Sequence, residues 1–180
     1  LRGADRICAT VAEQSLPGAG AKPWRAFLSA DQGEDGGVVH ARDRIGQGPW
    51  YDRRGRLFAA TLAAALNTRP MGCDTAICND LPNEDGVPNR APSGMQLDNH
   101  DTLTGSTTTG MRQNGANCRS WTTSATDAGR PTVGHSWPAN SGQNWMNAHP
   151  AGGCGAGVNL QQTGGPNAPT VGSGGGYGGF

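Results

Sequence analysis

Residues 111–122 read MRQNGANCRSWT, and they are followed by GHSW at residues 134–137, QNWMN at residues 143–147 and a cysteine at position 154. Two cysteines therefore bracket three tryptophans in a segment that has almost no aliphatic residues and no helical period. Such a segment cannot order itself by burying apolar surface, because fixing each backbone residue costs roughly 1–2 kcal/mol. A disulfide between Cys118 and Cys154 would contribute about 3–4 kcal/mol by closing this loop, and the tryptophan rings would form local cores.

The length of 180 residues indicates a single domain that spans residues 1–180. The chain contains 30 glycines and 12 prolines, a composition that raises disorder as an alternative. Five tryptophans spread through non-repetitive sequence argue against disorder. We therefore expect an ordered globule that is rich in loops.

Charge and hydropathy argue against nucleic-acid binding and against a membrane span. The formal net charge is zero, and the largest basic groups are the short stretches at residues 42–44 and 53–56. This pattern disfavours binding to nucleic acid, which needs a basic surface. The chain has no apolar run near the roughly 20 residues that a membrane-spanning helix needs, so we expect no membrane span.

The cysteines are the best sequence evidence for the compartment. The chain has five cysteines: Cys8, Cys73, Cys78, Cys118 and Cys154. No two of them form a C-x-x-C pair, and their spacing is not that of a zinc finger, which argues against metal binding by thiolates. Structural disulfides are typical of proteins outside the cytosol, and the chain opens without a signal peptide, as expected after processing. We therefore predict an extracellular or cell-surface protein. Cys73 and Cys78 are close enough for a local disulfide, and an odd number leaves one cysteine over.

Hydrophobic periodicity predicts a few regular elements. Residues 3–14 read as an amphipathic helix with Ala4, Ile7, Cys8 and Val11 facing the core, and residues 57–66 read as a second helix. Residues 22–30 alternate in the manner of a core strand, and residues 102–106 read as the entry to another strand. The Gly-rich residues 163–180 are either a flexible terminus or a last strand cut short.

Several short motifs occur in an order that resembles a known family: GADRIC at residues 3–8, WRAFLS at 24–29, GPWY at 48–51, LTG at 103–105 and CRSWT at 118–122. The family comprises bacterial secreted proteins and lipoproteins of unknown function. It is related to the endostatin-like branch of the C-type lectin-like fold. The resemblance implies an α+β domain with a small twisted antiparallel sheet, short helices and long loops pinned by disulfides.

The same resemblance implies a pairing of the cysteines. Cys118 would pair with Cys154, and Cys8 would pair with a cysteine in a final strand just past Phe180. The sequence stops before that position. Cys8 has therefore either lost its partner or is available to another chain.

Lectin-like loops of this fold bind calcium through carboxylate and amide oxygens, which are the ligands that hard cations prefer. Asn144 and Asn147 flank Trp145 in a pattern that distantly resembles the lectin Trp-Asn-Asp signature, but the acidic residue of that signature is absent here. A structural Ca²⁺ is easier to place in the region that begins at Asn83 and Glu84, with the predicted ligands Asp85, Asp98, Asn99 and Asp101. The alternative is that these side chains only form turns and caps.

The remaining polar residues give no catalytic pattern. The four histidines occur singly, and we expect each to be a surface or loop residue: His40, His100, His135 and His149. No G-x-S-x-G motif is present, and the presence of Ser, His and Asp does not by itself make a triad. We therefore expect a protein that is not an enzyme.

Exposed aromatic rings would suit a binding function. Trp50 and Trp137 are flanked by Pro and Gly loops, and we predict that they are exposed and bind ligand together with Asn144 and Asn147. Trp24 and Trp121 are assigned to the core, since a domain poor in Phe, Ile and Leu must fill its interior with other residues.

These observations favour an extracellular, non-enzymatic lectin-like module that recognises a glycan or an extracellular protein. The alternative is a self-assembling subunit of an extracellular filament, sheath or surface layer. In that case the zero net charge would allow close packing of copies, and Cys8 or the Gly-rich end would link neighbours.

Overall fold

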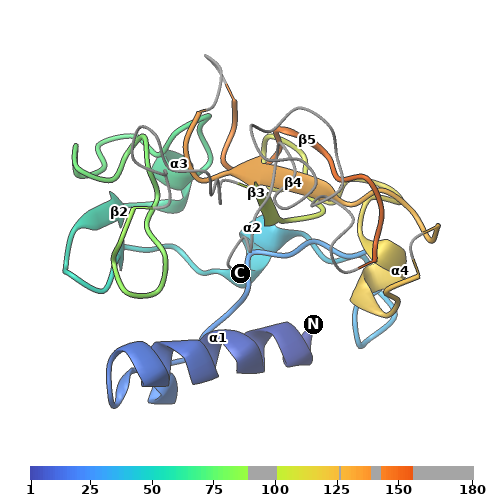
Figure 1. Ribbon diagram of the computed structural model, residues 1–180, viewed down its shortest axis with the longest axis horizontal. Coiled ribbons are helices and arrows are strands. Elements are labelled where there is room, and N and C mark those ends of the chain that lie inside the picture. The colour runs from blue at the N-terminus through green and yellow to red at the C-terminus, as the bar shows by residue number, and fades with distance from the viewer. Residues whose placement is uncertain (89–100, 126, 139–142, 156–180) are drawn as a thin grey trace, which may run out of the picture.

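The computed structural model describes residues 1–88, 101–125, 127–138 and 143–155 of the chain. Within these ranges the fold is α+β, as predicted, with short helices and two small antiparallel sheets. In Figure 1 the first helix lies beneath the rest of the chain. The two-stranded sheet lies to one side of the molecule, and the three-stranded sheet lies to the other side.

The elements are short and are joined by long loops. In chain order the structure contains α1 (Arg2–Ser15), the 3₁₀ helix η1 (Ala19–Ala21), α2 (Ala41–Arg44), β1 (Trp50–Tyr51), β2 (Leu57–Ala59), α3 (Leu62–Ala65), β3 (Asp101–Leu103), α4 (Cys118–Trp121), β4 (Thr132–His135) and β5 (His149–Pro150). None of the described helices is both long and apolar enough to cross a bilayer. The Gly-rich residues 163–180 lie outside the described residues.

Helix α1 confirms the helix predicted at residues 3–14, and polar contacts of Asp5 join it to the domain. Ile7 is 51% exposed rather than buried, and Cys8 is half-buried. The buried apolar residue of α1 is Ala12. Asp5 anchors the helix, because its carboxylate accepts hydrogen bonds from the Ala26 amide at 2.9 Å and from Arg44 at 2.7 Å. The prediction of an apolar core face is therefore wrong for Ile7.

Residues 22–30 are extended but do not form the predicted strand. Ala30 makes an isolated antiparallel bridge with Val39, and Ala26 and Leu28 are buried. Trp24 is 38% exposed, so its assignment to the core is wrong. Its indole N–H donates to the Ala19 carbonyl at 2.8 Å, which places the ring against η1.

The helix predicted at residues 57–66 is divided into two elements. Leu57–Ala59 forms β2, which pairs antiparallel with β1, and α3 begins only at Leu62. Thr61 ends the strand and caps the helix, because its hydroxyl accepts a hydrogen bond from the Ala64 amide at 3.2 Å. Strand pairing and this cap override the helix propensity of the Ala-rich sequence.

The turn between β1 and β2 is organised by one carboxylate. Asp52 accepts hydrogen bonds from the amides of Arg54 at 2.9 Å and Arg56 at 2.8 Å, and from Nε of Arg56 at 2.7 Å. Burial alone would raise the pKa of Asp52, but these hydrogen bonds favour the charged form and lower the pKa below its ordinary value.

The low pKa of Asp52 predicts an effect of pH on stability. The folded protein binds this proton less tightly than the unfolded chain, so the stabilisation is present above the ordinary pKa of Asp and is lost as pH falls through the folded pKa. We expect the Asp52→Asn variant to be less stable than wild type at pH 7 and to show a smaller further loss between pH 5 and pH 3. Urea unfolding at a series of pH values measures both effects. An unchanged slope of stability against pH in the variant would contradict this assignment.

The three-stranded sheet has the order β3-β4-β5 and is antiparallel throughout. Asp101 lies directly opposite His135, and His149 lies opposite Val133. Every residue of β4 is buried. The central strand β4 is therefore interior, whereas β3 is partly buried and the outer strand β5 is only two residues long.

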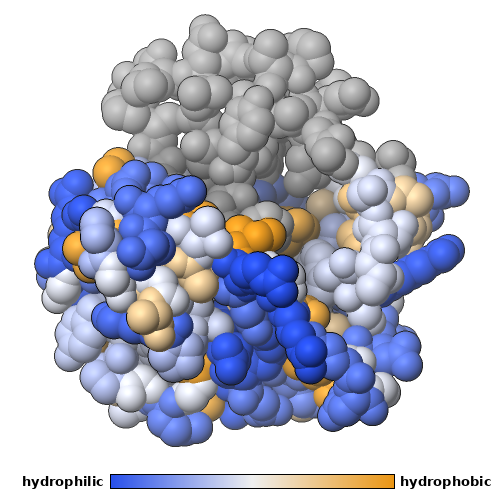
Figure 2. Space-filling view, turned by 90° about the horizontal axis from the view of Figure 1, so that it is seen from below, coloured by the Kyte–Doolittle hydropathy of each residue, from blue (hydrophilic) through white to orange (hydrophobic). Residues whose placement is uncertain are grey.

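The buried core is made mainly of small residues, and three larger aromatic residues form a half-buried cluster. The Trp145 ring packs against Phe27 with the centroids 4.7 Å apart and against Phe58 at 5.2 Å. The indole N–H of Trp145 donates to the Ala65 carbonyl at 2.8 Å, which ties the late loop to α3. Seen from the side on which α1 lies, the surface is mostly hydrophilic with small, separate hydrophobic areas (Figure 2).

Both predicted disulfides are present. Cys73 pairs with Cys78 and Cys118 pairs with Cys154, with Cα–Cα distances of 5.5 and 5.7 Å, while Cys8 is free. The Cys118–Cys154 bond secures an unusual conformation, because residues 118–121 of α4 all have positive φ between 49° and 63°. A left-handed residue other than glycine costs roughly 1–2 kcal/mol, so this turn needs external support.

The loop lengths predict unequal contributions from the two disulfides. In the chain-entropy picture a closed loop of 36 residues stabilises by about 4 kcal/mol and one of five residues by about 2 kcal/mol. We expect the paired substitution Cys118→Ala with Cys154→Ala to lower the free energy of unfolding about twice as much as Cys73→Ala with Cys78→Ala. Urea denaturation of the three proteins tests this order. A larger loss from the Cys73–Cys78 pair would contradict it.

Candidate functional site

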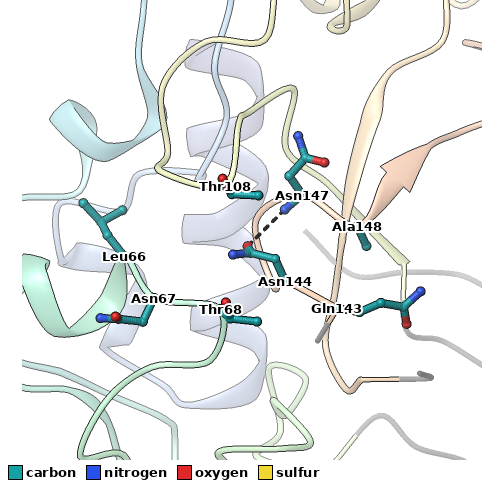
Figure 3. A pocket seen from close by; sticks show the side chains of 8 residues that line it. All are labelled: Leu66, Asn67, Thr68, Thr108, Gln143, Asn144, Asn147 and Ala148. Carbon is teal, nitrogen blue, oxygen red and sulfur yellow. Dashed lines mark hydrogen bonds between the residues drawn. The ribbon is translucent and has the colours of Figure 1, made fainter. Parts of the chain in front are cut away.

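A pocket of about 480 Å³ lies where the loop before β5 meets the segment after α3. Its lining is dominated by amide and hydroxyl side chains and contains no charged residue (Figure 3): Leu66, Asn67, Thr68, Thr108, Gln143, Asn144, Asn147 and Ala148. In Figure 3 the Asn144 side chain lies near the centre, between the Leu66–Thr68 segment and the side chains of Gln143 and Ala148. Two of the residues predicted to bind ligand, Asn144 and Asn147, are thus brought together in one pocket.

Local hydrogen bonds fix the orientation of both asparagines. The Oδ1 atom of Asn144 accepts from the amides of Met146 at 2.6 Å and Asn147 at 3.2 Å, and Nδ2 of Asn147 donates to the Ser106 carbonyl at 2.7 Å. Within the described residues, Nδ2 of Asn144 and Oδ1 of Asn147 have no hydrogen-bond partner. These two side chains therefore present an amide donor and an amide acceptor to the pocket in fixed positions.

The two tryptophans predicted to bind ligand do not line this pocket. Trp50 is half-buried in β1, where it pairs with Ala59. Trp137 is half-buried just after β4. Trp121, which was assigned to the core, is half-buried, and its indole N–H donates to the Ser29 carbonyl at 2.8 Å.

The predicted calcium ligands are not assembled into one site among the described residues. Asp85 is exposed and lines a separate pocket of about 200 Å³ beside α1, whereas Asp101 is buried in β3. Asp98 and Asn99 lie outside the described residues. Asn83 forms a turn, since its Oδ1 accepts from the amides of Asp85 at 3.1 Å and Val87 at 3.0 Å.

Asp101 instead lies beside two histidines that sequence reasoning treated as unrelated. Its Oδ1 atom is 3.0 Å from Nε2 of His135 and 3.3 Å from Nε2 of His149. The two imidazole rings meet edge to face with centroids 4.9 Å apart. The expectation that every histidine is a surface or loop residue is wrong for His135, which is 2% exposed.

The other nitrogen of each imidazole ring, Nδ1, lies close to an oxygen atom. Nδ1 of His135 lies 2.6 Å from Oε1 of Gln143, and Nδ1 of His149 lies 3.1 Å from the Pro150 carbonyl. The hydrogen bond with Asp101 raises the pKa of His149, while burial and the charge of Arg130 oppose that rise. The three ligand atoms all lie within 4.8 Å of one another, a spacing that allows one metal ion to contact all three.

Arg69 holds the end of β4 that carries His135. Its guanidinium donates to the carbonyls of Cys78 at 3.0 Å and His135 at 2.7 Å, and also to the Ser136 carbonyl. Burial lowers the pKa of Arg69 to about 10, so the side chain stays charged at neutral pH. One planar side chain thus joins the small disulfide loop to the strand next to the histidine cluster.

The structure predicts a large effect of replacing this arginine. We expect Arg69→Met to lower the free energy of unfolding by roughly 2–4 kcal/mol, because partly buried carbonyls would lose charged donors. The control is Arg6→Met, which removes an exposed arginine of α1. Urea unfolding of both variants tests the expectation. Equal stability of the two variants would show that the Arg69 hydrogen bonds contribute little.

Comparisons with protein-family models, with curated proteins and with solved structures gave no significant match for this chain. The pocket and the histidine cluster are therefore interpreted from their own chemistry. The histidine cluster was missed because its members lie far apart in sequence, at positions 101, 135 and 149. Only the strand register brings them to one place.

Proposed function

We propose that the protein is an extracellular, non-enzymatic recognition module that binds an uncharged, hydroxyl-rich ligand, of which a glycan is the typical example. The observation that carries the proposal is the pocket lined by the asparagines Asn67, Asn144 and Asn147. Its volume of about 480 Å³ lies within the range of roughly 300–1,000 Å³ typical of small-molecule sites.

The polar groups of the pocket suit hydroxyl groups better than ions. A hydroxyl both donates and accepts hydrogen bonds, so the hydroxyls of one ligand can pair with Nδ2 of Asn144 and with Oδ1 of Asn147. Charged residues are absent from the lining, which gives an ionic ligand no partner. The hydrogen bonds to Met146 and Ser106 hold both amides in place before the ligand arrives, which reduces the entropy cost of binding.

The disulfides support a location outside the cell. Cys73–Cys78 and Cys118–Cys154 form in an oxidising compartment and persist there. A mixed fold with small antiparallel sheets and long disulfide-pinned loops agrees with the C-type lectin-like, endostatin-like architecture that the motifs resemble. Under this proposal the recognition surface lies on the loops, as is usual for binding sites.

The alternative of a self-assembling subunit has weaker support. Linkage of neighbours through Cys8 needs a reactive thiolate, but the Cys8 thiol is half-buried, and burial together with Asp5 raises its pKa. The Gly-rich end, the other suggested link, falls outside the described residues. Among the described residues no observation favours assembly over recognition.

A single isosteric substitution tests the recognition proposal. Asn144→Asp keeps the Oδ1 atom that accepts from Met146 and Asn147, but it replaces the free amide donor with a second acceptor. We expect wild type to bind a subset of glycans on an array and Asn144→Asp to bind them about 10–100-fold more weakly, since a ligand hydroxyl left without its hydrogen-bond donor in the bound state costs about 1–3 kcal/mol.

The matched control is Asn114→Asp, which adds the same charge at an exposed asparagine away from the pocket. This control should bind like wild type, and circular dichroism should show that all three proteins are folded. Equal binding by Asn144→Asp and wild type would exclude the pocket. Failure of wild type to bind any glycan, with ordered polymers visible by electron microscopy, would favour self-assembly instead.

A further inference from the structure

The largely buried cluster of Asp101, His135 and His149 does not line the proposed recognition pocket. Each residue comes from a different strand of the three-stranded sheet. Asp101 is the direct partner of His135, and His149 is the partner of Val133, two residues from His135 on β4. Residues two apart on a strand share a face, so the register places all three side chains on one face of the sheet.

We propose that these three side chains bind a transition-metal ion, with Zn²⁺ as the best fit. The separations between ligand atoms support this assignment. With zinc–ligand bonds of about 2.0–2.1 Å, two ligands of a tetrahedral site lie roughly 3.3–3.4 Å apart. The distances from Oδ1 of Asp101 to the two Nε2 atoms are 3.0 and 3.3 Å, so small side-chain movements would admit the ion.

The contacts of the two Nδ1 atoms also fit a metal site. A carbonyl oxygen can only accept a hydrogen bond, so the Pro150 carbonyl requires a proton on Nδ1 of His149. Oε1 of Gln143 has the same effect on His135. The neutral rings then carry their lone pairs on Nε2, which is the atom that faces Asp101. Metal-binding histidines are oriented in this way, with the other ring nitrogen donating to a carbonyl or carboxylate oxygen.

The ligand set distinguishes among metals. Two imidazole nitrogens and one carboxylate oxygen suit Zn²⁺ and its neighbours in the transition series, whereas Ca²⁺ takes six to eight oxygens. Asp101 was expected to bind calcium, but two imidazole nitrogens lie 3.0 and 3.3 Å from its Oδ1 atom. The site therefore favours zinc over calcium.

The surroundings of the cluster indicate what the ion does. Asp101 and His135 are almost fully buried, while the side chain of His149 is 31% exposed and gives the ion a route from solvent. β5 pairs with β4 over only two residue pairs. An ion held by all three strands would cross-link this short sheet and stabilise it, because metal-binding free energy adds directly to folding.

The competing arrangement is a protonated His149 that pairs with Asp101 without any metal. Calorimetric titration of the full chain, stripped with a chelator, with ZnCl₂ distinguishes the two. We expect one zinc per chain, a higher melting temperature with zinc than with chelator, and no comparable effect of CaCl₂. His149→Gln and Asp101→Asn should weaken zinc binding by about 100-fold or more, since even outer-shell partners contribute 10–100-fold.

His40→Asn is the matched control, because His40 lies outside the cluster and the asparagine Oδ1 can replace Nδ1 as acceptor for the Arg112 amide. This variant should bind zinc like wild type. Ring ¹⁵N spectra of wild type give a measurement that does not depend on any variant folding. Zinc should shift the Nε2 resonances of His135 and His149 and leave those of His40 unchanged. Absence of these shifts, or unchanged zinc affinity in folded His149→Gln, would overturn the proposal.

Discussion

The bond between Cys118 and Cys154 is the constraint on which the functional half of the molecule depends. The loop that it closes contains β4, β5, the five residues 143–147 that include Asn144 and Asn147, and both histidines of the cluster. At its first end the bond holds α4, whose four residues are all left-handed. Asn117 supports the same turn, since its side chain accepts from the Ser120 amide at 2.8 Å. A conformation that costs energy locally is thus maintained by a covalent bond and a cap.

Polar contacts provide much of the stabilisation that a large apolar core provides in other domains. The core consists mainly of alanines with few large residues, so it buries limited apolar area per residue. Asp5 and Arg44 dock α1, Asp52 shapes the β1–β2 turn, and Arg69 joins the small disulfide loop to β4. Each of these charged groups has several hydrogen-bond partners, which is the condition under which a partly buried charge is tolerated.

The sequence predicted the features that depend on local signals. Helix α1 followed from its apolar spacing, and the Cys73–Cys78 bond followed from a short separation. Residues 57–66 were misassigned because a pairing with β1, invisible in the Ala-rich sequence, decides their structure. Trp24 was misplaced because composition cannot say which large ring lies at the surface. Local pattern identifies an element, but tertiary pairing decides its limits.

The two candidate sites differ in how far the sequence could indicate them. Asn144 and Asn147 belong to one short motif, so a family resemblance was enough to single them out, and the structure adds the pocket that they share. Asp101, His135 and His149 form no motif, because only the register of β3, β4 and β5 unites them. The sites nevertheless meet at consecutive residues, since Gln143 contacts His135 and Asn144 lies in the pocket. Both sites therefore depend on the conformation of the same loop, and the Cys118–Cys154 disulfide that closes this loop stabilises both of them.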